Sequence, residues 1–570
     1  MLSNRLATWP RLALATSLAL PATLAVAQST PVIPDAAAPA TTTTPAGPTV
    51  AEAAAAQWYL RDPQLDKTPG TGTTRAYAEL LKGRVPTAVV VAVIDSGIDT
   101  AHVDLKPVLW RNPGEIPGNG IDDDKNGYID DVHGWNFLGG KDGRNISVET
   151  LEVTRVVAKL GPRFAGKTAA QVKAADKADY ATYLKAKKAY DAKRKELTEE
   201  LQQGEQISGP LTEMTSMLKQ KLGVTRLDTA TMRQAAAKLP EAEGGGLLLS
   251  LYQNMKQGGI GDTDALLAEI GTELKDQREQ LDYSLNTKFN ARADIVKDNP
   301  DDVTQRNYGN NDVTGPDALH GTHVAGIIAA VRTNNLGVQG IAAAPVQVMS
   351  VRAVPNGDER DKDVANAIRY AVDNGAQIIN MSFGKEFSPQ RPAVEAAYKY
   401  AASKNVLLVH AAGNEDDNLD VIPHYPASFY LDGTVPPNLL TVGASGPQDD
   451  ENLTASFSNY SKRQVDVFAP GVGIYSTLPG NKYGSESGTS MASPVTAGVA
   501  AVLKSYYPSL TAVDLKRIIR QSAQVHHTLV LVPGEKGKKA DFATLSATGG
   551  IVDLYAALQL AAQTEATKKP

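Results

Sequence analysis

The sequence predicts an α/β fold in which a mostly parallel central sheet carries helices on both faces, with an inserted all-helical module. Continuous apolar runs rich in β-branched residues alternate with helix-like patterns, as is typical of strands covered on both faces. This alternation favours parallel strands joined by helices. Residues 147–299 break the pattern, because they are rich in Ala, Lys, Glu and Gln and contain almost no strand-like run. The strand-like runs are residues 88–94, 346–351, 377–381, 406–409 and 439–442, and helix-like stretches include 364–373 and 393–403.

The length and composition indicate a globular protein with one large domain and an extra module. The chain has 570 residues, of which 42% are hydrophobic, and a net charge of −6. So small a charge gives no reason to expect nucleic acid as a partner. The sequence contains no cysteine, so the hydrophobic core, with bound metal ions if there are any, must hold the fold together.

The first 27 residues are typical of a secretory signal peptide. Arg5 and Arg11 supply the positive start, an apolar run covers residues 12–25, and small residues at 25–27 form a cleavage site. A membrane anchor is the alternative, but the run is shorter than the roughly 20 residues that cross a bilayer. We therefore expect an exported chain without a membrane anchor, either periplasmic or secreted. Residues 28–56, rich in Ala, Thr and Pro, are predicted to form a linker.

The helical module is predicted to span residues 147–299 and to interrupt one domain formed by residues 57–146 and 300–562. Helix-favouring runs cover residues 174–202 and 263–284. A charged spacer without a specific role is the alternative. Because the module leaves and rejoins the domain near its functional residues, we expect it to gate or shape access to them.

Three short motifs contain the candidate catalytic residues. Asp95 lies in VIDSG (93–97), His320 in HGTHVAG (320–326) and Ser490 in GTSMASP (488–494). Asp95 ends a predicted strand, where α/β sheets place their sites. A fourth motif, AAGNE (411–415), contains Asn414 and follows another strand-like run. The order Asp, His, Ser resembles that of the subtilisin-like serine proteases, or subtilases.

The resemblance implies a role for each of these residues. Ser490 would be the nucleophile, His320 the general base, and Asp95 the group that orients His320. The Asn414 side chain and the Ser490 backbone N–H would stabilise the oxyanion. A metal site formed by His320 and His323 is the alternative, although no third ligand accompanies the pair at a suitable spacing.

The resemblance also implies the walls of a substrate cleft. One segment would form the first pocket and pair with substrate backbone, and a second would bind the residues preceding the cut as an added strand. His424 stands at the pocket floor, where it could narrow the pocket, favour an acidic or polar side chain, or turn away. The substrate-binding residues expected on this basis are Ser382, Phe383, Gly384, Pro355, Asn356, Gly357, Ala412, Gly413 and His424.

An acidic segment at 122–131 resembles the first nine positions of an EF-hand calcium loop. The twelfth position is His133 rather than glutamate, so a further ligand would come from Asp131 or from elsewhere. We expect a structural calcium ion here, and a solvated acidic turn is the alternative. The predicted ligands are Asp122, Asp124, Asn126, Tyr128 and Asp130.

These features together predict an exported serine endopeptidase that cleaves proteins or peptides through an acyl-enzyme. Catalysis would need no cofactor. A non-catalytic peptide-binding protein on the same scaffold is one alternative, but no motif residue is missing. A lipase or esterase is another, and its Gly-x-Ser-x-Gly elbow is absent around Ser490. The sequence leaves the natural substrate and the oligomeric state open.

Overall fold

The computed structural model describes residues 48–237, 245–257 and 260–568, and the chain divides into two compact units. The larger unit comprises residues 46–190 and 283–570, and residues 191–282 belong to the smaller one. The predicted signal peptide (1–27) lies outside the described residues, as does most of the predicted linker. The end of that linker forms a short helix, α1 (Val50–Ala53), which is capped by Thr49.

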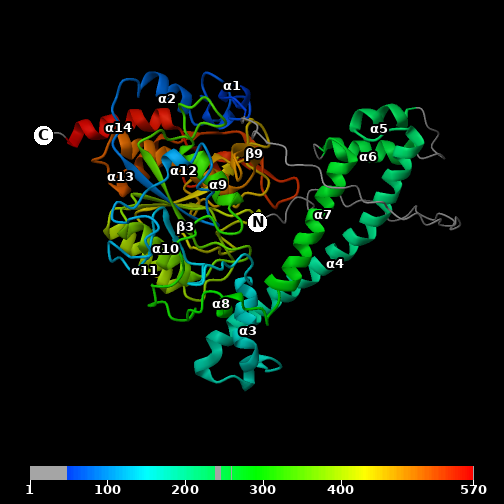
Figure 1. The fold of residues 1–570 in the computed structure, drawn as a ribbon, viewed down its shortest axis with the longest axis horizontal. Coiled ribbons are helices and arrows are strands. Elements are labelled where there is room, and N and C mark those ends of the chain that lie inside the picture. Colours follow the sequence, from blue (N-terminus) through cyan, green and yellow to red (C-terminus); the bar gives the residue numbers. More distant parts are fainter. Residues whose placement is uncertain (1–47, 238–244, 258–259, 569–570) are drawn as a thin grey trace. The chain divides into compact units, whose positions relative to one another are not determined.

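A nine-stranded sheet forms the centre of the larger unit, in the order β10-β13-β7-β6-β5-β4-β1-β3-β2 (Figure 1). All neighbouring strands pair in parallel except β10 and β13 at one edge. The five strand-like runs of the sequence correspond to β1, β3, β4, β5 and β6, which confirms the predicted fold class. The strands are β1 (Val89–Asp95), β2 (Gly134–Asn136), β3 (Val346–Arg352), β4 (Ile378–Met381), β5 (Leu407–Ala411), β6 (Leu439–Ser445), β7 (Val467–Pro470), β10 (Gln524–Val525) and β13 (Gly550–Ile551).

Helices cover both faces of this sheet, as the alternating side chains of β1 illustrate. Val91 and Val93 belong to a core cluster that includes residues of α9 (Leu319–Ala329) and α12 (Thr489–Tyr506). Ala92 and Ile94 point to the other face and belong to a second cluster, together with residues of α10 (Asp361–Asp373) and α11 (Arg391–Ser403). The β1 strand is therefore buried on both sides, which explains its uninterrupted apolar sequence.

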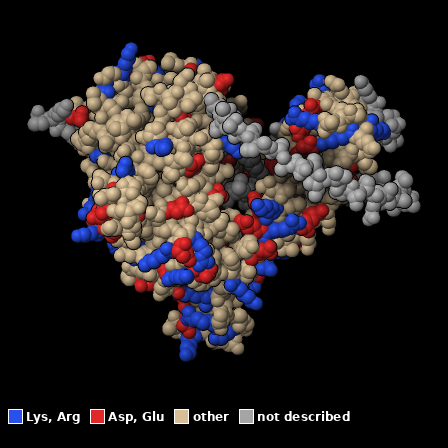
Figure 2. All heavy atoms as spheres, in the orientation of Figure 1, with Lys and Arg blue, Asp and Glu red and all other residues tan. Residues whose placement is uncertain are grey.

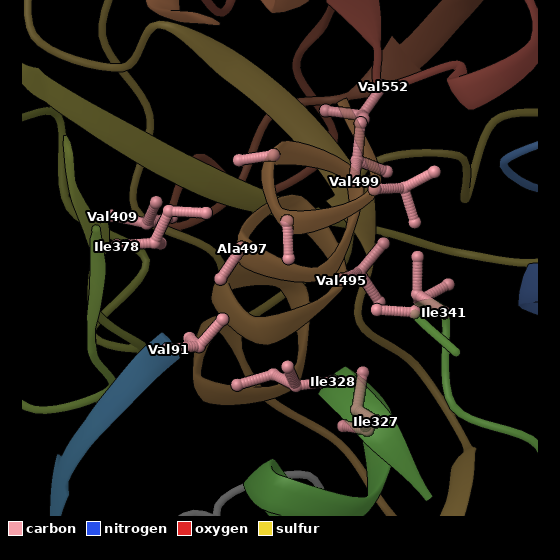
Figure 3. Packing of buried hydrophobic residues seen from close by; sticks show 14 of the residues in the cluster. Val91, Ile327, Ile328, Ile341, Ile378, Val409, Val495, Ala497, Val499 and Val552 are labelled. Atoms are coloured by element: carbon pink, nitrogen blue, oxygen red, sulfur yellow. The ribbon is translucent and has the colours of Figure 1, made fainter. Parts of the chain in front are cut away.

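Helix α12 runs through the middle of the first cluster. Figure 3 shows its Val495 and Ala497 among apolar side chains from the strands and from α9. Pro494 has no backbone N–H to donate to the carbonyl of Ser490, four residues earlier. The Ser382 hydroxyl donates to that carbonyl instead, at 2.9 Å.

The remaining helices and two hairpins complete the larger unit. They are α2 (Thr73–Glu79), α3 (Glu152–Phe164), α8 (Ala291–Asp294), α13 (Ala512–Ser522) and α14 (Leu554–Lys568), with β8 (Ile474–Leu478) paired to β9 (Lys482–Glu486) and β11 (Leu529–Leu531) paired to β12 (Lys539–Asp541).

The smaller unit is helical. It contains the distal part of α4 (Lys177–Leu222), followed by α5 (Thr229–Ala236), α6 (Gly245–Gln257) and α7 (Thr263–Glu279), which ends in a π-helical turn. No strand is assigned between 147 and 299 in the part of the chain that the structure describes. A separate apolar cluster fills the unit, and its buried members include Leu218, Leu227, Met232, Leu248, Met255 and Leu266.

The compact units divide at 190/191 and 282/283, so the segments on either side of the smaller unit pack with the sheet domain. Leu151 donates its backbone N–H to Ser284 at 3.0 Å, and Tyr190 donates its hydroxyl to the Leu285 carbonyl at 2.8 Å. The boundaries at 147 and 299 that the sequence suggests for the insertion stay a prediction.

Charged side chains of both signs are interspersed on the face drawn in Figure 2. Among the described residues, no helix combines the length and the apolar content that a membrane crossing requires.

Candidate active site

Asp95 is the last residue of β1, at the carboxyl end of the parallel sheet. Its side chain is buried, and its Oδ1 lies 2.7 Å from His320 Nδ1. The backbone N–H of Ser96 donates to the same oxygen at 2.8 Å. The carboxylate is therefore held in place by its own chain and directed at His320.

His320 is the second residue of α9. Because the Asp95 carboxylate only accepts, Nδ1 carries the proton, and Nε2 is left as the basic nitrogen. Nε2 is shielded from solvent and has no hydrogen-bond partner among the described residues. Burial opposes protonation of the ring, but attraction and hydrogen bonding to Asp95 outweigh it and raise the pKa of His320.

Ser490 lies in the first turn of α12, beside the end of β1. Its hydroxyl donates to the carbonyl of Ser382 at 3.2 Å. Ile94 pairs with Met381 in the sheet, so the next residues on the two strands, Asp95 and Ser382, lie opposite each other. The register thus brings Ser490 to the strand end that carries Asp95.

The Asn414 side chain is oriented by the first residue of α12. The backbone N–H and the hydroxyl of Thr489 both donate to Asn414 Oδ1, at 2.8 and 2.9 Å. These bonds identify the opposite end of the amide as Nδ2. A methyl carbon built on Gly488 would lie 3.5 Å from Asn414 Nδ2 and 3.6 Å from Ser490 N. The two donors therefore border one small space.

The residues before Asn414 form the connection that places it. Ala412 is buried and donates its N–H to the Val442 carbonyl at 2.9 Å. Gly413 has a φ of +104°, and a β-carbon there would approach Asn459 Nδ2 to 2.3 Å. Only glycine fits this turn without strain.

The two predicted cleft walls continue from β4 and β3. Ser382 and Phe383 are buried, whereas Gly384 is partly exposed. Pro355, Asn356 and Gly357 follow the end of β3. The backbone N–H of Asn356 donates to Ser147 at 2.8 Å, and its carbonyl accepts from Glu149 at 2.9 Å. The sequence did not reveal this pairing, because residues 147–149 carry no strand pattern.

His424 turns toward two carboxylates. Its Nε2 lies 2.9 Å from Asp417 Oδ2, and its Nδ1 lies 3.5 Å from Glu415 Oε2. Two acidic groups thus hold the ring, and the effect of His424 on the pocket stays a prediction. Glu415 directly follows Asn414, so the His424 ring belongs to the same part of the site.

His323 has a different environment from His320. It is fully buried, its Nε2 lies 3.2 Å from the Gly484 carbonyl, and burial lowers its pKa to about 4. The one group of three or more acidic, histidine or cysteine side chains with ligand spacing in the described chain includes neither histidine. The metal alternative for His320 and His323 therefore lacks a third ligand among the residues that were described.

Among the described residues, the predicted carboxylates Asp122 and Asp130 do not belong to a group of side chains with metal-ligand spacing. Asp122 accepts the backbone N–H groups of Asn126 (3.0 Å) and Gly127 (2.8 Å). Asp130 accepts three backbone N–H groups from residues 118–120. The Tyr128 ring is buried among other aromatic rings. Asp122 and Asp130 thus shape the loop.

A different carboxylate group forms beside this loop. Glu115, Asp124 and Asp131 offer oxygens that lie within 4.8 Å of one another. Glu115 Oε2 is buried and has no hydrogen-bond partner among the described residues, and burial raises the pKa of Asp131 to about 6. The predicted residue Asn126 belongs to the same group, since its Nδ2 donates to Asp131 and Asp124 at 3.0 and 3.1 Å. Glu115 was missed because it precedes the ligand-like motif by several residues.

Comparison with known proteins assigns the family. A family profile described as "Subtilase family" matches residues 87–550. A "Thermophilic serine proteinase" of Bacillus sp. (strain AK1) is 42% identical over 205 residues, which cover 36% of this chain and 46% of the relative. "Thermitase" of Thermoactinomyces vulgaris is 41% identical over 187 residues, with coverages of 33% and 61%. The chain thus spans about half the length of the first relatives that it matches.

A protease structure from Pseudoalteromonas arctica PAMC 21717 is 27% identical, covers 44% of this chain and 78% of its own, and has a TM-score of 0.35. The assignment therefore depends on the family profile, which covers most of the chain. The parallel sheet, in which strand β1 ends at Asp95, is consistent with it. The chain belongs to the subtilase family.

Proposed function

We propose that this protein is an exported serine endopeptidase that hydrolyses peptide bonds in proteins. The main support is the geometry at the end of β1. There Asp95 contacts His320, whose Nε2 has no hydrogen-bond partner among the described residues, and the neighbouring Ser382 carbonyl accepts from Ser490. In this proposal Ser490 Oγ attacks the peptide carbonyl while His320 Nε2 takes its proton. The nearby carboxylate of Asp95 stabilises the imidazolium that results.

The remaining steps use the same few groups. The carbonyl oxygen of the substrate becomes an oxyanion beside Gly488, where Asn414 Nδ2 and the Ser490 N–H border one space. His320 then gives its proton to the leaving amine, and the acyl group stays on Ser490. A water molecule, deprotonated by His320, then attacks the acyl-enzyme carbonyl. The bond to Ser490 Oγ breaks, His320 returns the proton to that oxygen, and the carboxylic acid leaves.

The test is the loss of a covalent label. Native protein should react with a fluorophosphonate probe and hydrolyse casein, and Ser490→Ala should do neither. Ser485→Ala, which changes an exposed serine on β9, is the matched control and should keep both activities. Undiminished hydrolysis by purified Ser490→Ala would refute the assignment. Specific peptide binding by native protein without labelling or hydrolysis would favour the non-catalytic alternative.

Export is proposed from residues 1–27. Mass spectrometry of protein from the medium or the periplasm should show an N-terminus at Gln28. An intact N-terminus on protein that stays in the cytoplasm would contradict export.

We also propose that Glu115, Asp124 and Asp131 hold a calcium ion, with Asn126 beside them. The support is a group of carboxylates in which the buried Glu115 Oε2 has no hydrogen-bond partner within the described part of the chain, because hard cations prefer such ligands. A bound ion would offset the repulsion among the carboxylates and stiffen the loop. Calcium should raise the Tm of native protein treated with chelator, and Glu115→Gln should weaken this response. An unchanged Tm in calcium would contradict the site.

A further inference from the structure

Among the residues that the structure describes, no strand occupies the position beyond Asp95 in the sheet. Strand β1 ends there, between β4 and β3, while the chain continues from its neighbours as residues 382–385 and 353–359. Neighbouring strands are about 4.8 Å apart, so these two segments are separated by roughly 9.6 Å, the width that one extended peptide fills. We call this place the open strand position.

The outer edge of each flanking segment is already occupied. Asn356 exchanges backbone hydrogen bonds with Ser147 and Glu149 on one side. On the other side, Lys385 donates its backbone N–H to Tyr425 at 2.8 Å and accepts from it at 2.9 Å. Because backbone groups alternate along an extended segment and those of Lys385 point outward to Tyr425, Gly384 presents its own inward. A bound peptide therefore has its backbone partners only within the open strand position.

A buried ammonium group joins the two segments at the far end of this position. Lys385 Nζ donates to the Glu359 carbonyl at 2.6 Å. It also lies 2.8 Å from Asp361 Oδ1 and 2.9 Å from Glu152 Oε2. The Lys385 side chain is 1% exposed. We call these contacts the Lys385 bridge.

Helix α3 reinforces the bridge from the side. Arg155 lies 2.7 Å from Glu152 Oε2 and donates to the Asp358 carbonyl at 3.1 Å. The backbone N–H of Glu152 donates to the Asp358 carboxylate at 2.7 Å. Breaking a buried ion pair by removing one partner costs about 3–5 kcal/mol, so a substrate residue does not easily displace these groups.

The distance from Ser490 to the Lys385 bridge limits the length of peptide that can bind between them. The Ser490 hydroxyl contacts the carbonyl of Ser382, and Lys385 lies three residues further along the same segment. Three extended residues span about 10 Å. Peptide residues preceding the cut would extend from Ser490 toward Lys385, as the family resemblance implies.

We infer that the Lys385 bridge closes the open strand position, so that about three substrate residues before the cut bind as a strand. A longer chain must leave the site at that point and gains no further backbone contacts. Lys385 and Glu152 are then residues that determine specificity. This inference rests on the proposed function, because it concerns the length of peptide that the protease recognises.

A ladder of peptides tests the inference on the native protein. Acetyl-capped substrates with two, three, four and five residues before the same cleaved bond should show kcat/KM rising up to three residues. The fourth and fifth residues should then change kcat/KM by less than about 2-fold. A 10-fold rise at the fourth residue, equivalent to about 1.4 kcal/mol, would overturn the inference. If no peptide of any length is hydrolysed, the proposed function fails instead.

A double variant tests the residues themselves. Lys385→Ala with Glu152→Ala removes one charge of each sign from the bridge, and kcat/KM should then rise at least 5-fold from the third to the fourth residue. Lys399→Ala with Glu395→Ala is the matched control, because it removes a pair at 2.6 Å whose lysine is 54% exposed. The control should keep the native ladder. If the folded double variant showed the same dependence of kcat/KM on peptide length as the native protein, the role of Lys385 would be contradicted. If the variant does not fold, the peptide series measured on the native protein decides.

Discussion

The site around Asp95 and the ionic cluster around Arg292 are both built from buried polar groups, and they differ in how fully those groups are paired. At the first, Asp95 Oδ2 and His320 Nε2 have no hydrogen-bond partner among the described residues. At the second, all three guanidinium nitrogens of Arg292 donate to Asp298 and Asp363, and all three side chains are at most 1% exposed.

The difference in pairing distinguishes groups that can react from groups that only hold the structure in place. A fully paired buried charge has its partners in fixed places, so it stabilises one arrangement of the chain and offers nothing to a ligand. A buried nitrogen without a partner is costly to maintain. An unpaired basic nitrogen is what the proposed role of His320 as general base requires, because the proton of the reacting serine then has an acceptor. The Lys385 bridge belongs to the paired kind.

The strongest test of this contrast is Asp95→Asn. The change keeps the shape of the side chain but removes the charge that fixes the tautomer of His320, and we expect kcat to fall by about 10⁴-fold. The native enzyme should lose activity as the pH falls through an apparent pKa above the ordinary value of 6.5, because the protonated ring cannot act as a base. In Asp95→Asn the acidic limb should move to lower pH, since burial then acts without the opposing carboxylate. An acidic limb at the native pH in the variant would contradict the assigned pair.

A smaller effect is expected from changes to Asn414, the oxyanion donor of the proposed mechanism. Loss of one oxyanion donor costs about 10²–10³-fold in kcat, as the corresponding change in subtilisin illustrates. Asn414→Asp keeps an acceptor for Thr489 and removes the Nδ2 donor, whereas Asn414→Ala removes both. Both variants should lower kcat by that factor with little change in KM. If Asn414→Asp alone retained native kcat, the amide would serve only to position Thr489.

Substitutions in the ionic cluster around Arg292 should lower the stability of the protein and leave its rate of hydrolysis unchanged. Arg292→Met leaves Asp298 with Lys362 alone and Asp363 without its guanidinium, and we expect a loss of about 3–5 kcal/mol in the free energy of unfolding. The kcat/KM of the folded variant should stay native, as urea titration and peptide hydrolysis can show together. Arg144→Met is the control, because its pairs are exposed and should contribute at most about 1 kcal/mol. A large fall in kcat/KM for folded Arg292→Met would remove the distinction between the two regions.

The sequence predicted most of what lies on regular elements. The strands were predictable because burial on both faces demands continuous apolar runs. Short local motifs supplied the candidate catalytic residues Asp95, His320, Asn414 and Ser490, whose roles stay a prediction. The pairing of Asn356 with residues 147–149 was not predictable, because backbone groups form it and they leave no pattern in the side chains.

Ion pairs between residues that are distant in sequence were not predicted, for a related reason. Lys385 meets Glu152 across more than two hundred residues, and an isolated lysine and glutamate look like any solvated pair. In the acidic loop the local spacing suggested ligands, but backbone N–H groups use Asp122 and Asp130, and Glu115 completes the carboxylate group. Local motifs therefore pointed to the candidate reactive groups, whereas the charged groups that surround them left no local pattern in the sequence.

The smallest expected effect concerns the second histidine of the HGTHVAG motif. His323 differs from His320 by one turn of α9, yet it contacts the Gly484 carbonyl, and its lowered pKa of about 4 keeps it neutral in the physiological range. His323→Gln can keep a donor near that carbonyl, so we expect a loss of about 1 kcal/mol in stability and less than a few-fold change in kcat/KM. His320→Gln is the matched comparison and should be inactive. If the two variants lost equal activity, catalysis would depend on the start of helix α9 as a whole. It would then not depend specifically on His320 Nε2, the ring nitrogen on the far side from Asp95.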